Sequence, residues 1–250
     1  MTSKDNRTLT RRSLLACGMS AAAGATAAAC LGPASVTLAR AGEKAAGEKA
    51  AGEKAAGEKA KVKTYTSAEF YDAGGKFLVD KARAAYYDMF RRFGNPISET
   101  LKKEMWILDF NLGDFALVGM AGIFWLNRED YKYFGHEIYL LPGQMIPEHS
   151  HVATDKGAAK MESWQPRRGM VYTFGEGEPT PELCEKIPKS QRDLVKSRHA
   201  APLAIDEIGH LNRLTAWHFM VAGPEGALVT EYGTFHDGDG LRFSNPKVKL

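Results

Sequence analysis

Hydrophobic residues between residues 66 and 92 recur at intervals of three and four, which predicts an amphipathic helix. Thr66 and Glu69 have the spacing of a capping box at the start of this helix. The turn sequence Gly94-Asn95-Pro96 ends it. A second, shorter helix is expected over residues 98–104.

The pattern changes after residue 105, where short apolar or aromatic runs are separated by Gly, Asn, Asp and Pro. These runs cover residues 106–112, 115–118, 123–126, 137–141, 170–174, 214–222 and 227–232. Many short strands with turn residues between them predict an all-β sandwich or barrel. The polar stretch 179–199 is expected to be a loop with a short helix.

The first 41 residues have the order of parts found in an export signal. Arg11 and Arg12 precede an apolar run rich in Ala and Gly, and the small residues Ala39 and Ala41 suit cleavage after Ala41. The segment resembles a twin-arginine signal peptide. This resemblance implies the twin-arginine export machinery as a partner and a periplasmic or secreted protein. Cys30 follows three alanines, which leaves lipoprotein processing at that cysteine as an alternative.

A repeat separates this signal from the rest of the chain. Residues 41–60 are four copies of Ala-Gly-Glu-Lys-Ala. The period of five does not match the helical repeat, and every copy contains Gly, so the segment cannot form a core. We therefore predict a polar linker over residues 42–62 and one folded domain over residues 63–250.

Charge and cysteine content narrow the classes of function. The net charge of the 250-residue chain is +3, with Lys and Arg spread along it, which argues against a nucleic-acid partner. No stretch after residue 60 is long and apolar enough to span a bilayer, so no membrane span is expected once the signal is removed. Cleavage after Ala41 would leave Cys184 as the single cysteine. The mature chain would then have neither an intrachain disulfide nor a zinc–thiolate cluster.

Three histidines and one glutamate are candidate metal ligands. His149 and His151 are two residues apart, so in a strand both imidazoles point to the same side. Glu162 and His218 follow within the β-rich region. Three imidazoles and one carboxylate suit a divalent first-row metal and leave coordination positions open for a substrate.

The spacing of these residues resembles the cupin signature. Gly143 is followed after five residues by His149-Ser150-His151, and Glu162 is followed after six residues by Gly169. The resemblance implies a mainly β fold, a double-stranded β-helix or jelly-roll barrel, with N-terminal helices. Ten residues separate His151 from Glu162, more than is usual in the family, and the second cupin motif departs from its usual pattern.

Two further segments carry a narrower resemblance. They are Lys160-Met161-Glu162-Ser163 with Arg168-Gly169, and Trp217-His218-Phe219 followed by Thr230-Glu231-Tyr232-Gly233. Their order and spacing are similar to those of the D-lyxose ketol-isomerase family of cupins, and the resemblance covers roughly residues 65–245.

This family resemblance implies a role for each of several residues. The metal ligands would be His149, His151, Glu162 and His218, and the usual metal of the family is manganese. The catalytic pair would be Lys160 and Glu231. The residues near the sugar hydroxyls would be Asp237, Asp239 and Arg242.

The function that follows from the resemblance is that of an exported aldose–ketose isomerase of carbohydrate metabolism. Such an enzyme moves a proton between adjacent carbons of an open-chain sugar through a metal-stabilised enediolate. Two alternatives remain open: a metal-containing sugar-binding cupin without catalysis, and an iron-dependent cupin dioxygenase. A homodimer is a further expectation.

Overall fold

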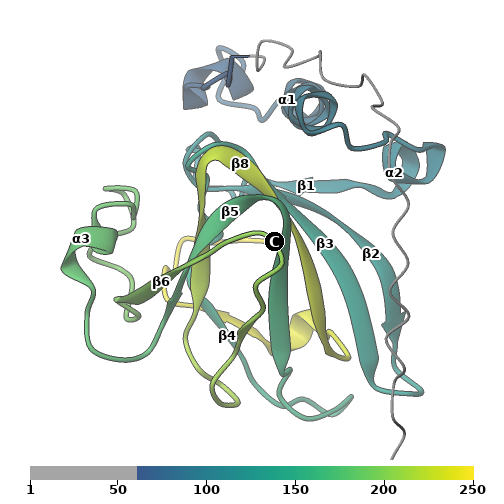
Figure 1. The fold of residues 1–250 in the computed structure, drawn as a ribbon, viewed down its shortest axis with the longest axis vertical. Coiled ribbons are helices and arrows are strands. Elements are labelled where there is room, and N and C mark those ends of the chain that lie inside the picture. The colour runs from purple at the N-terminus through teal and green to yellow at the C-terminus, as the bar shows by residue number, and fades with distance from the viewer. Residues whose placement is uncertain (1–60) are drawn as a thin grey trace, which may run out of the picture. The chain divides into compact units, whose positions relative to one another are not determined.

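The computed structural model describes residues 61–250, which form a curved antiparallel sheet with helices at one end (Figure 1). The predicted signal at 1–41, including Cys30, and all but the last two residues of the predicted linker lie outside the described residues. Within residues 61–250, no helix is both long and apolar enough to cross a membrane.

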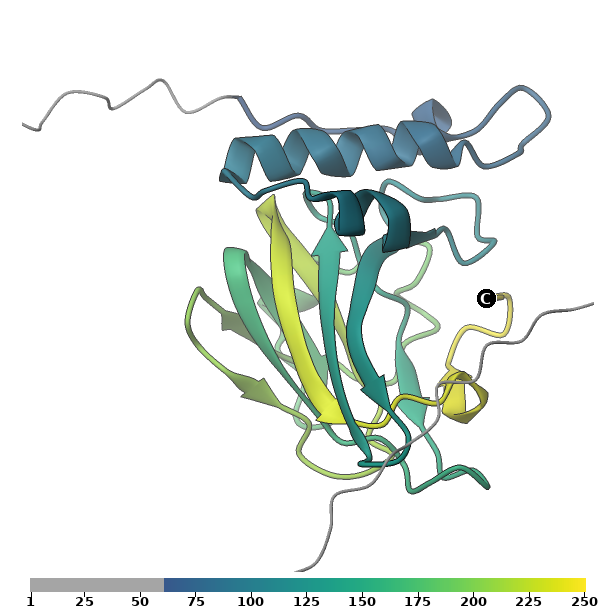
Figure 2. The same ribbon diagram turned by 90° about the vertical axis from the view of Figure 1, so that its right-hand side faces the viewer.

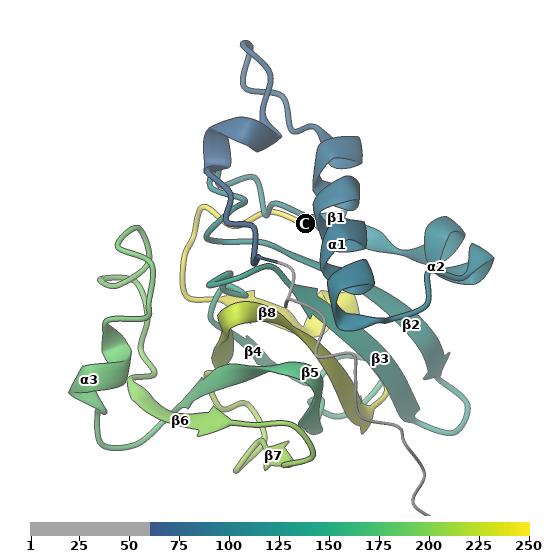
Figure 3. The same cartoon turned by 45° about the horizontal axis from the view of Figure 1, so that its top comes forward.

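Nine strands confirm the predicted mainly β fold of the described residues. They are β1 (Trp106–Leu108), β2 (Met120–Arg128), β3 (Tyr133–Leu140), β4 (His149–His151), β5 (Glu162–Gly175), β6 (His199–Leu203), β7 (Gly209–His210), β8 (Phe219–Thr234) and β9 (Leu241–Phe243). Seven strands form one sheet in the order β1-β2-β3-β8-β5-β6, with β7 also paired to β5 (Figure 3). The other two, β4 and β9, form a separate small sheet.

The N-terminal helices differ from the predicted single helix in their first half. The capping box of Thr66 and Glu69 is present, but it caps only the single 3-10 turn η1 (Ser67–Phe70). The chain then turns at Gly74-Gly75, where Gly75 has φ +80°, and α1 begins only at Val79 (Val79–Phe93). A positive φ is a conformation that glycine adopts readily and that a helix cannot contain, so the two glycines break the helix. The predicted end at Gly94 and the short helix α2 (Glu99–Glu104) are confirmed.

Helix α1 lies across one end of the strands (Figure 2). Its buried side chains are Ala82, Ala85, Tyr86, Met89 and Phe90, and they pack in one cluster with Phe115, Tyr139 and Leu141. The Tyr86 hydroxyl donates a hydrogen bond of 2.7 Å to Gln144 Oε1, and Gln144 Nε2 donates one of 2.5 Å to the Phe115 carbonyl. This buried network fixes the turn at Gly143-Gln144, a few residues before β4, and so connects the helix to the strand that carries two candidate ligands.

The polar stretch between β5 and β6 contains the predicted short helix, α3 (Pro181–Cys184). The end of this stretch that leads into β6 is held by the carboxylate of Glu148, which is almost fully buried. The backbone amides of Lys196 and Ser197 donate to this carboxylate at 2.6–3.0 Å. Because Glu148 is the residue before β4, this loop packs directly against the segment that positions His149.

Candidate metal and active site

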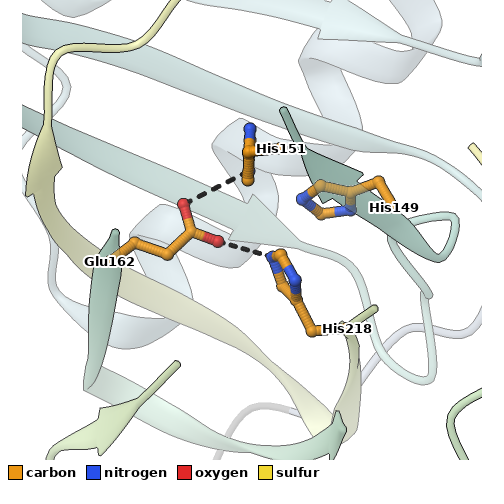
Figure 4. A group of neighbouring side chains, drawn as sticks. All are labelled: His149, His151, Glu162 and His218. Carbon is orange, nitrogen blue, oxygen red and sulfur yellow. Dashed lines mark ion pairs between the residues drawn. The ribbon is translucent and has the colours of Figure 1, made fainter. Parts of the chain in front are cut away.

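The four predicted ligands come together from three segments of the chain (Figure 4). His149 and His151 are on β4, Glu162 begins β5, and His218 directly precedes β8. One ligand atom from each residue lies within 4.8 Å of those of the other three. The backbones of His149 and His218 exchange two hydrogen bonds, of 3.0 and 2.9 Å, which places their rings side by side with centroids 4.3 Å apart.

Backbone carbonyls orient two of the imidazoles. Nδ1 of His149 lies 3.0 Å from the carbonyl oxygen of Pro147, and Nδ1 of His218 lies 2.9 Å from that of Ala216. A carbonyl only accepts hydrogen bonds, so the proton of each neutral ring is on Nδ1. Nε2 of each ring is therefore free to act as a ligand, an arrangement typical of metal-binding histidines.

The electrostatics of the cluster keep His149 and Glu162 in the forms that bind metals, whereas for His218 burial would lower the pKa, but Glu162 outweighs it and raises the pKa. Burial and the neighbouring imidazoles of His218 and His151 hold the pKa of His149 well below its ordinary value, so this ring is neutral at pH 7. Burial alone would raise the pKa of Glu162, but Lys160 and His218 outweigh it and hold that pKa well below the ordinary value. A neutral imidazole and an ionised carboxylate need not lose a proton before they coordinate a metal.

Unpaired polar atoms show that this donor set fits a divalent metal. Nε2 of His151, Nε2 of His218 and Oε2 of Glu162 are buried and make no hydrogen bond of good geometry, although ion-pair contacts within the cluster and with Lys160 bring charged atoms to 2.5–3.5 Å from them. Buried polar groups without partners are rare in folded proteins because their desolvation is not compensated. A cation held between these atoms would satisfy all three, which supports a divalent metal at His149, His151, Glu162 and His218.

The longer spacing before Glu162 does not move it away from the site. The extra residues form a turn in which the amide of Thr154 donates to the carbonyl of Gly157 at 3.0 Å. Beyond this turn the chain returns to the cavity, where His218 Nε2 lies 2.5 Å from Glu162 Oε1. Lys160 also reaches the site, with its Nζ 2.5 Å from Glu162 Oε2.

Lys160 forms a second ion pair, with Glu231, directly beside the ligand cluster. The side chains of Lys160, Glu162 and Glu231 are each no more than 7% exposed. Burial alone would lower the pKa of the Lys160 amine, but the carboxylates of Glu162 and Glu231 outweigh it and hold the pKa above its ordinary value. The absence of a side chain at Gly233 makes space for Lys160. A Cβ at this position would lie 3.2 Å from Lys160 Cε and 3.3 Å from the Phe134 ring.

Strand register places Glu231 on the inner face of the sheet. Directly paired residues on neighbouring strands share a face, and one such row contains Phe124 on β2, His136 on β3, Glu231 on β8 and Trp164 on β5. The second carboxylate oxygen of Glu231 lies 3.5 Å from His136 Nδ1.

These side chains line a cavity of about 310 Å³. Its walls include the four ligands, Lys160 and Glu231, and come from both sheets. Aromatic rings cover much of the rest, from Trp106, Phe124, Phe134, Trp164 and Phe243. The cavity therefore combines one cluster of charged groups with largely apolar walls, as small-molecule sites commonly do.

Sequence reasoning missed two histidines in this cavity, His136 and His236. His136 lies two residues after Phe134 and two before Ile138, and this alternation gives the three a common face of β3. The pattern marks an inward strand face, but the partner Glu231 is evident only from the register. Burial and the nearby Lys160 ammonium lower the pKa of His236 to about 3.

The structure does not bring Asp237, Asp239 and Arg242, predicted near the sugar hydroxyls, into this cavity. Asp237 accepts a hydrogen bond of 2.7 Å from Thr154 Oγ1, and Asp239 is an exposed partner of Lys156. Arg242 is exposed and donates to backbone carbonyls of its own segment.

The pairing of β9 with β4 gives the physical reason. Leu241 and Phe243 are the partners of His151 and His149, and all four line the cavity. Arg242, between Leu241 and Phe243, therefore points to the opposite side of the strand.

Curated relatives of this chain are sugar isomerases. The chain is 29% identical over 174 residues to the D-lyxose/D-mannose isomerase of Thermosediminibacter oceani, covering 70% of this chain and 94% of that protein. It is 29% identical over 169 residues to the D-lyxose ketol-isomerase of Cohnella laeviribosi, covering 68% of this chain and 91% of that protein. No family model matches the chain.

Solved structures share the fold at lower sequence identity. The L-ribose isomerase of Acinetobacter sp. DL28, a mutant in complex with L-ribose, aligns with a TM-score of 0.53 at 13% identity. The L-ribose isomerase of Cellulomonas parahominis aligns with a TM-score of 0.53 at 14% identity. Each alignment covers 72% of this chain and 95% of the other. The expected cupin fold is confirmed, and the chain is similar in sequence to D-lyxose ketol-isomerases.

Proposed function

We propose that this protein is a metal-dependent aldose–ketose isomerase whose substrate is an open-chain pentose or hexose of the D-lyxose or D-mannose kind. The curated relatives support the reaction class. The observation that carries the proposal is the buried pair of Lys160 and Glu231 beside four metal-ligating side chains in one cavity. Isomerisation needs these two functions together, a group that moves a proton and a cation that stabilises charge on oxygen.

The residues of the chain divide the chemistry between them. A divalent ion at His149, His151, Glu162 and His218 would supply a Lewis acid for the oxygens of the sugar carbonyl and the neighbouring hydroxyl. Glu231 takes the proton from the carbon beside the carbonyl and returns it to the adjacent carbon. Lys160, whose raised pKa keeps it protonated at pH 7, gives a proton to the carbonyl oxygen as negative charge develops there and takes up the proton of the neighbouring hydroxyl, whose oxygen becomes the ketose carbonyl. No net change in protons or electrons results, as an isomerisation requires.

Manganese is the metal we propose for the site. Imidazole nitrogens with one carboxylate form a mixed set that binds divalent first-row ions, and affinity alone does not select among them. Iron in the same set would suit the alternative oxygen-dependent chemistry, so metal identity and reaction must be measured together.

The test is metal analysis of the purified protein combined with assays for interconversion of D-lyxose, D-mannose and L-ribose with their ketoses. The expected result is about one manganese ion per chain and ketose formation from at least one of these sugars. Bound metal without turnover of any pentose or hexose would instead support the sugar-binding alternative. Oxygen uptake with an organic substrate and without ketose formation would support the dioxygenase alternative.

We also propose that the chain is exported by the twin-arginine route, on the order of parts in residues 1–41. Replacing both Arg11 and Arg12 by lysine keeps the charge of the signal and removes the arginine pair. The expected result in a bacterial host is that the protein moves from the periplasmic or secreted fraction to the cytoplasm. An unchanged distribution of the double variant would contradict this route.

A further inference from the structure

A metal ion bound at the four candidate ligands would not provide a partner for several other unpaired polar atoms in the cavity. Among residues 61–250, every buried side-chain nitrogen or oxygen without a hydrogen-bond partner belongs to a residue that lines this one cavity. Three of these atoms belong to the metal-ligand set. The others are Nε1 of Trp106, Nδ1 of His236 and both ring nitrogens of His136, of which Nδ1 lies 3.5 Å from a Glu231 carboxylate oxygen.

Such atoms point to a polar ligand. An unpaired buried donor or acceptor is destabilising, because the group has lost its water without gaining a partner. The indole nitrogen of Trp106 only donates, whereas a neutral imidazole offers one donor and one acceptor. A hydroxyl group both donates and accepts, so a ligand with several hydroxyls can satisfy all three side chains.

Two of these side chains, Trp106 and His136, lie on the side of the cavity away from the metal-ligand strand β5. In the sheet order, Trp106 on β1 and His136 on β3 lie beyond β8 from Glu162 on β5. The His136 ring stacks on Trp106, at 5.3 Å, and on Phe124, at 4.8 Å, and the Trp106 and Phe124 rings are themselves 5.6 Å apart. Gly122 makes room for this stack, since a Cβ there would collide with both His136 and Trp106.

His236 is held in place from the same side. The side chain of Asn127 on β2 binds the backbone of His236 twice, accepting from its amide at 3.0 Å and donating to its carbonyl at 2.9 Å. The imidazole stacks on Phe134 with centroids 5.7 Å apart, and it lies 6.0 Å from the ring of His151. His236 thus lies between the metal ligands and the aromatic wall.

We propose that Trp106, His136 and His236 form a hydroxyl-binding sub-site for the part of an open-chain polyhydroxy substrate that is remote from its carbonyl group. The proposal rests on the proposed function, because it places the carbonyl end at the metal ligands. The faces of Phe124 and Phe134 contact the C–H bonds between the hydroxyls. A substrate must then extend beyond its third carbon to use the sub-site, and the sub-site contributes to selection by length and hydroxyl configuration.

The test compares a five-carbon with a three-carbon substrate in the full chain supplied with manganese. Trp106→Phe and His236→Phe each keep an aromatic ring and remove the unpaired nitrogens. We expect each to lower kcat/KM for D-lyxose by about tenfold, the usual effect of one lost hydrogen bond. The kcat/KM for glyceraldehyde, which has no fourth or fifth carbon, should change less than about twofold. Trp125→Phe is the matched control, because Trp125 is half-exposed and lies outside the cavity, and it should alter neither value.

Equal losses on both substrates, or no loss on either, would overturn the sub-site. If the wild-type protein turns over neither sugar, the proposed function has failed, and the sub-site is tested by calorimetric titration with the five-carbon polyol arabinitol. Binding that Trp106→Phe and His236→Phe weaken by about tenfold, and Trp125→Phe does not, supports the sub-site independently of catalysis. No binding of the polyol, or equal binding by all four proteins, overturns it.

Discussion

Glu231 has a different buried neighbour on each carboxylate oxygen. Lys160 pairs with one oxygen, and His136 Nδ1 lies 3.5 Å from the other. Both neighbours are cationic or potential donors, so the carboxylate is held in one orientation beside the metal ligands. Among the described Asp and Glu side chains, only Glu162 and Glu231 line this cavity, and Glu162 belongs to the candidate metal-ligand set, so Glu231 is the residue that we propose as the proton carrier.

Glu231→Gln is therefore expected to abolish proton transfer and to leave the metal ligands intact. The amide keeps the shape of the carboxylate, and its oxygen can still accept from Lys160, but it cannot take a proton from carbon. Ketose formation should fall by about 10²- to 10⁴-fold, the range for loss of a general base. Metal content, measured on the same preparation, should equal that of the wild type. Unchanged turnover with metal bound would show that Glu231 is not the base.

For single residues, the sequence allowed a prediction where spacing along a strand determines the direction in which a side chain points. His149 and His151 could be paired from strand alternation alone, and Glu162 from the resemblance of its spacing to Gly169 to the cupin signature. His136 could not be found this way, because a single histidine in an alternating strand is common and its partner Glu231 lies far away in the chain. The family resemblance implied that Arg242 lies near the sugar hydroxyls, but strand alternation turns it away from the cavity.

Gly169 shows how one element depends on a single backbone conformation. It has φ +67° within β5, and a Cβ there would collide with the backbone carbonyl of Gly226 on β8. Gly169→Ala is expected to lower the free energy of unfolding by about 2 kcal/mol or more, because alanine neither fits the space nor favours the conformation. Urea denaturation measures this change.

Gly175 is the matched control in the same strand. It has no positive φ, and a Cβ there would have no neighbour within 4 Å. Gly175→Ala should change stability by less than about 1 kcal/mol. Similar losses for both variants would mean that β5 tolerates a side chain at neither position, and would contradict a specific role for the Gly169 conformation.

The loop between β5 and β6 depends on Glu148. Its buried carboxylate accepts from two successive amides, so Glu148→Ala leaves the Lys196 and Ser197 amides unpaired. We expect a loss of about 3 kcal/mol in stability. Hydrogen exchange at these two amides should accelerate, while Glu185→Ala, an exposed carboxylate in the same loop, leaves them unchanged. Protection that persists in Glu148→Ala would contradict the anchoring role.

The elements could be predicted from sequence where a pattern was uninterrupted. The strand-rich region and the end of α1 at Gly94 were evident. The start of α1 was not, because the apolar spacing continues across Gly74-Gly75, while the backbone does not. The order of the strands could not be predicted either, since β8 pairs with both β3 and β5 although it is distant from them in the chain.

For the molecule as a whole, metal binding should be linked to folding. The four ligands come from segments distant in sequence, so a metal ion binds the folded chain and not the unfolded one. At a free metal concentration of 100 times Kd, stabilisation is about 2.7 kcal/mol, a rise in Tm on the order of 5–10 °C. Thermal unfolding with and without a chelator measures it.

Removing one ligand separates this effect from general ionic stabilisation. His218→Ala should bind metal weakly and show little difference between chelator and manganese. His199→Ala, which replaces an exposed histidine outside the cavity, should behave like the wild type. An equal rise in Tm for His218→Ala would show that the metal acts elsewhere.

The order of strands across the large sheet also bears on how such a protein can diversify. The proposed recognition groups are on β1 and β3 and just after β8, whereas the metal ligands lie on β4 and β5 and just before β8. Mutations at Trp106 or Phe124 can therefore alter which sugar is accepted without disturbing the groups that carry out the reaction. A lineage could in this way acquire new substrates by small steps while its chemistry stays the same.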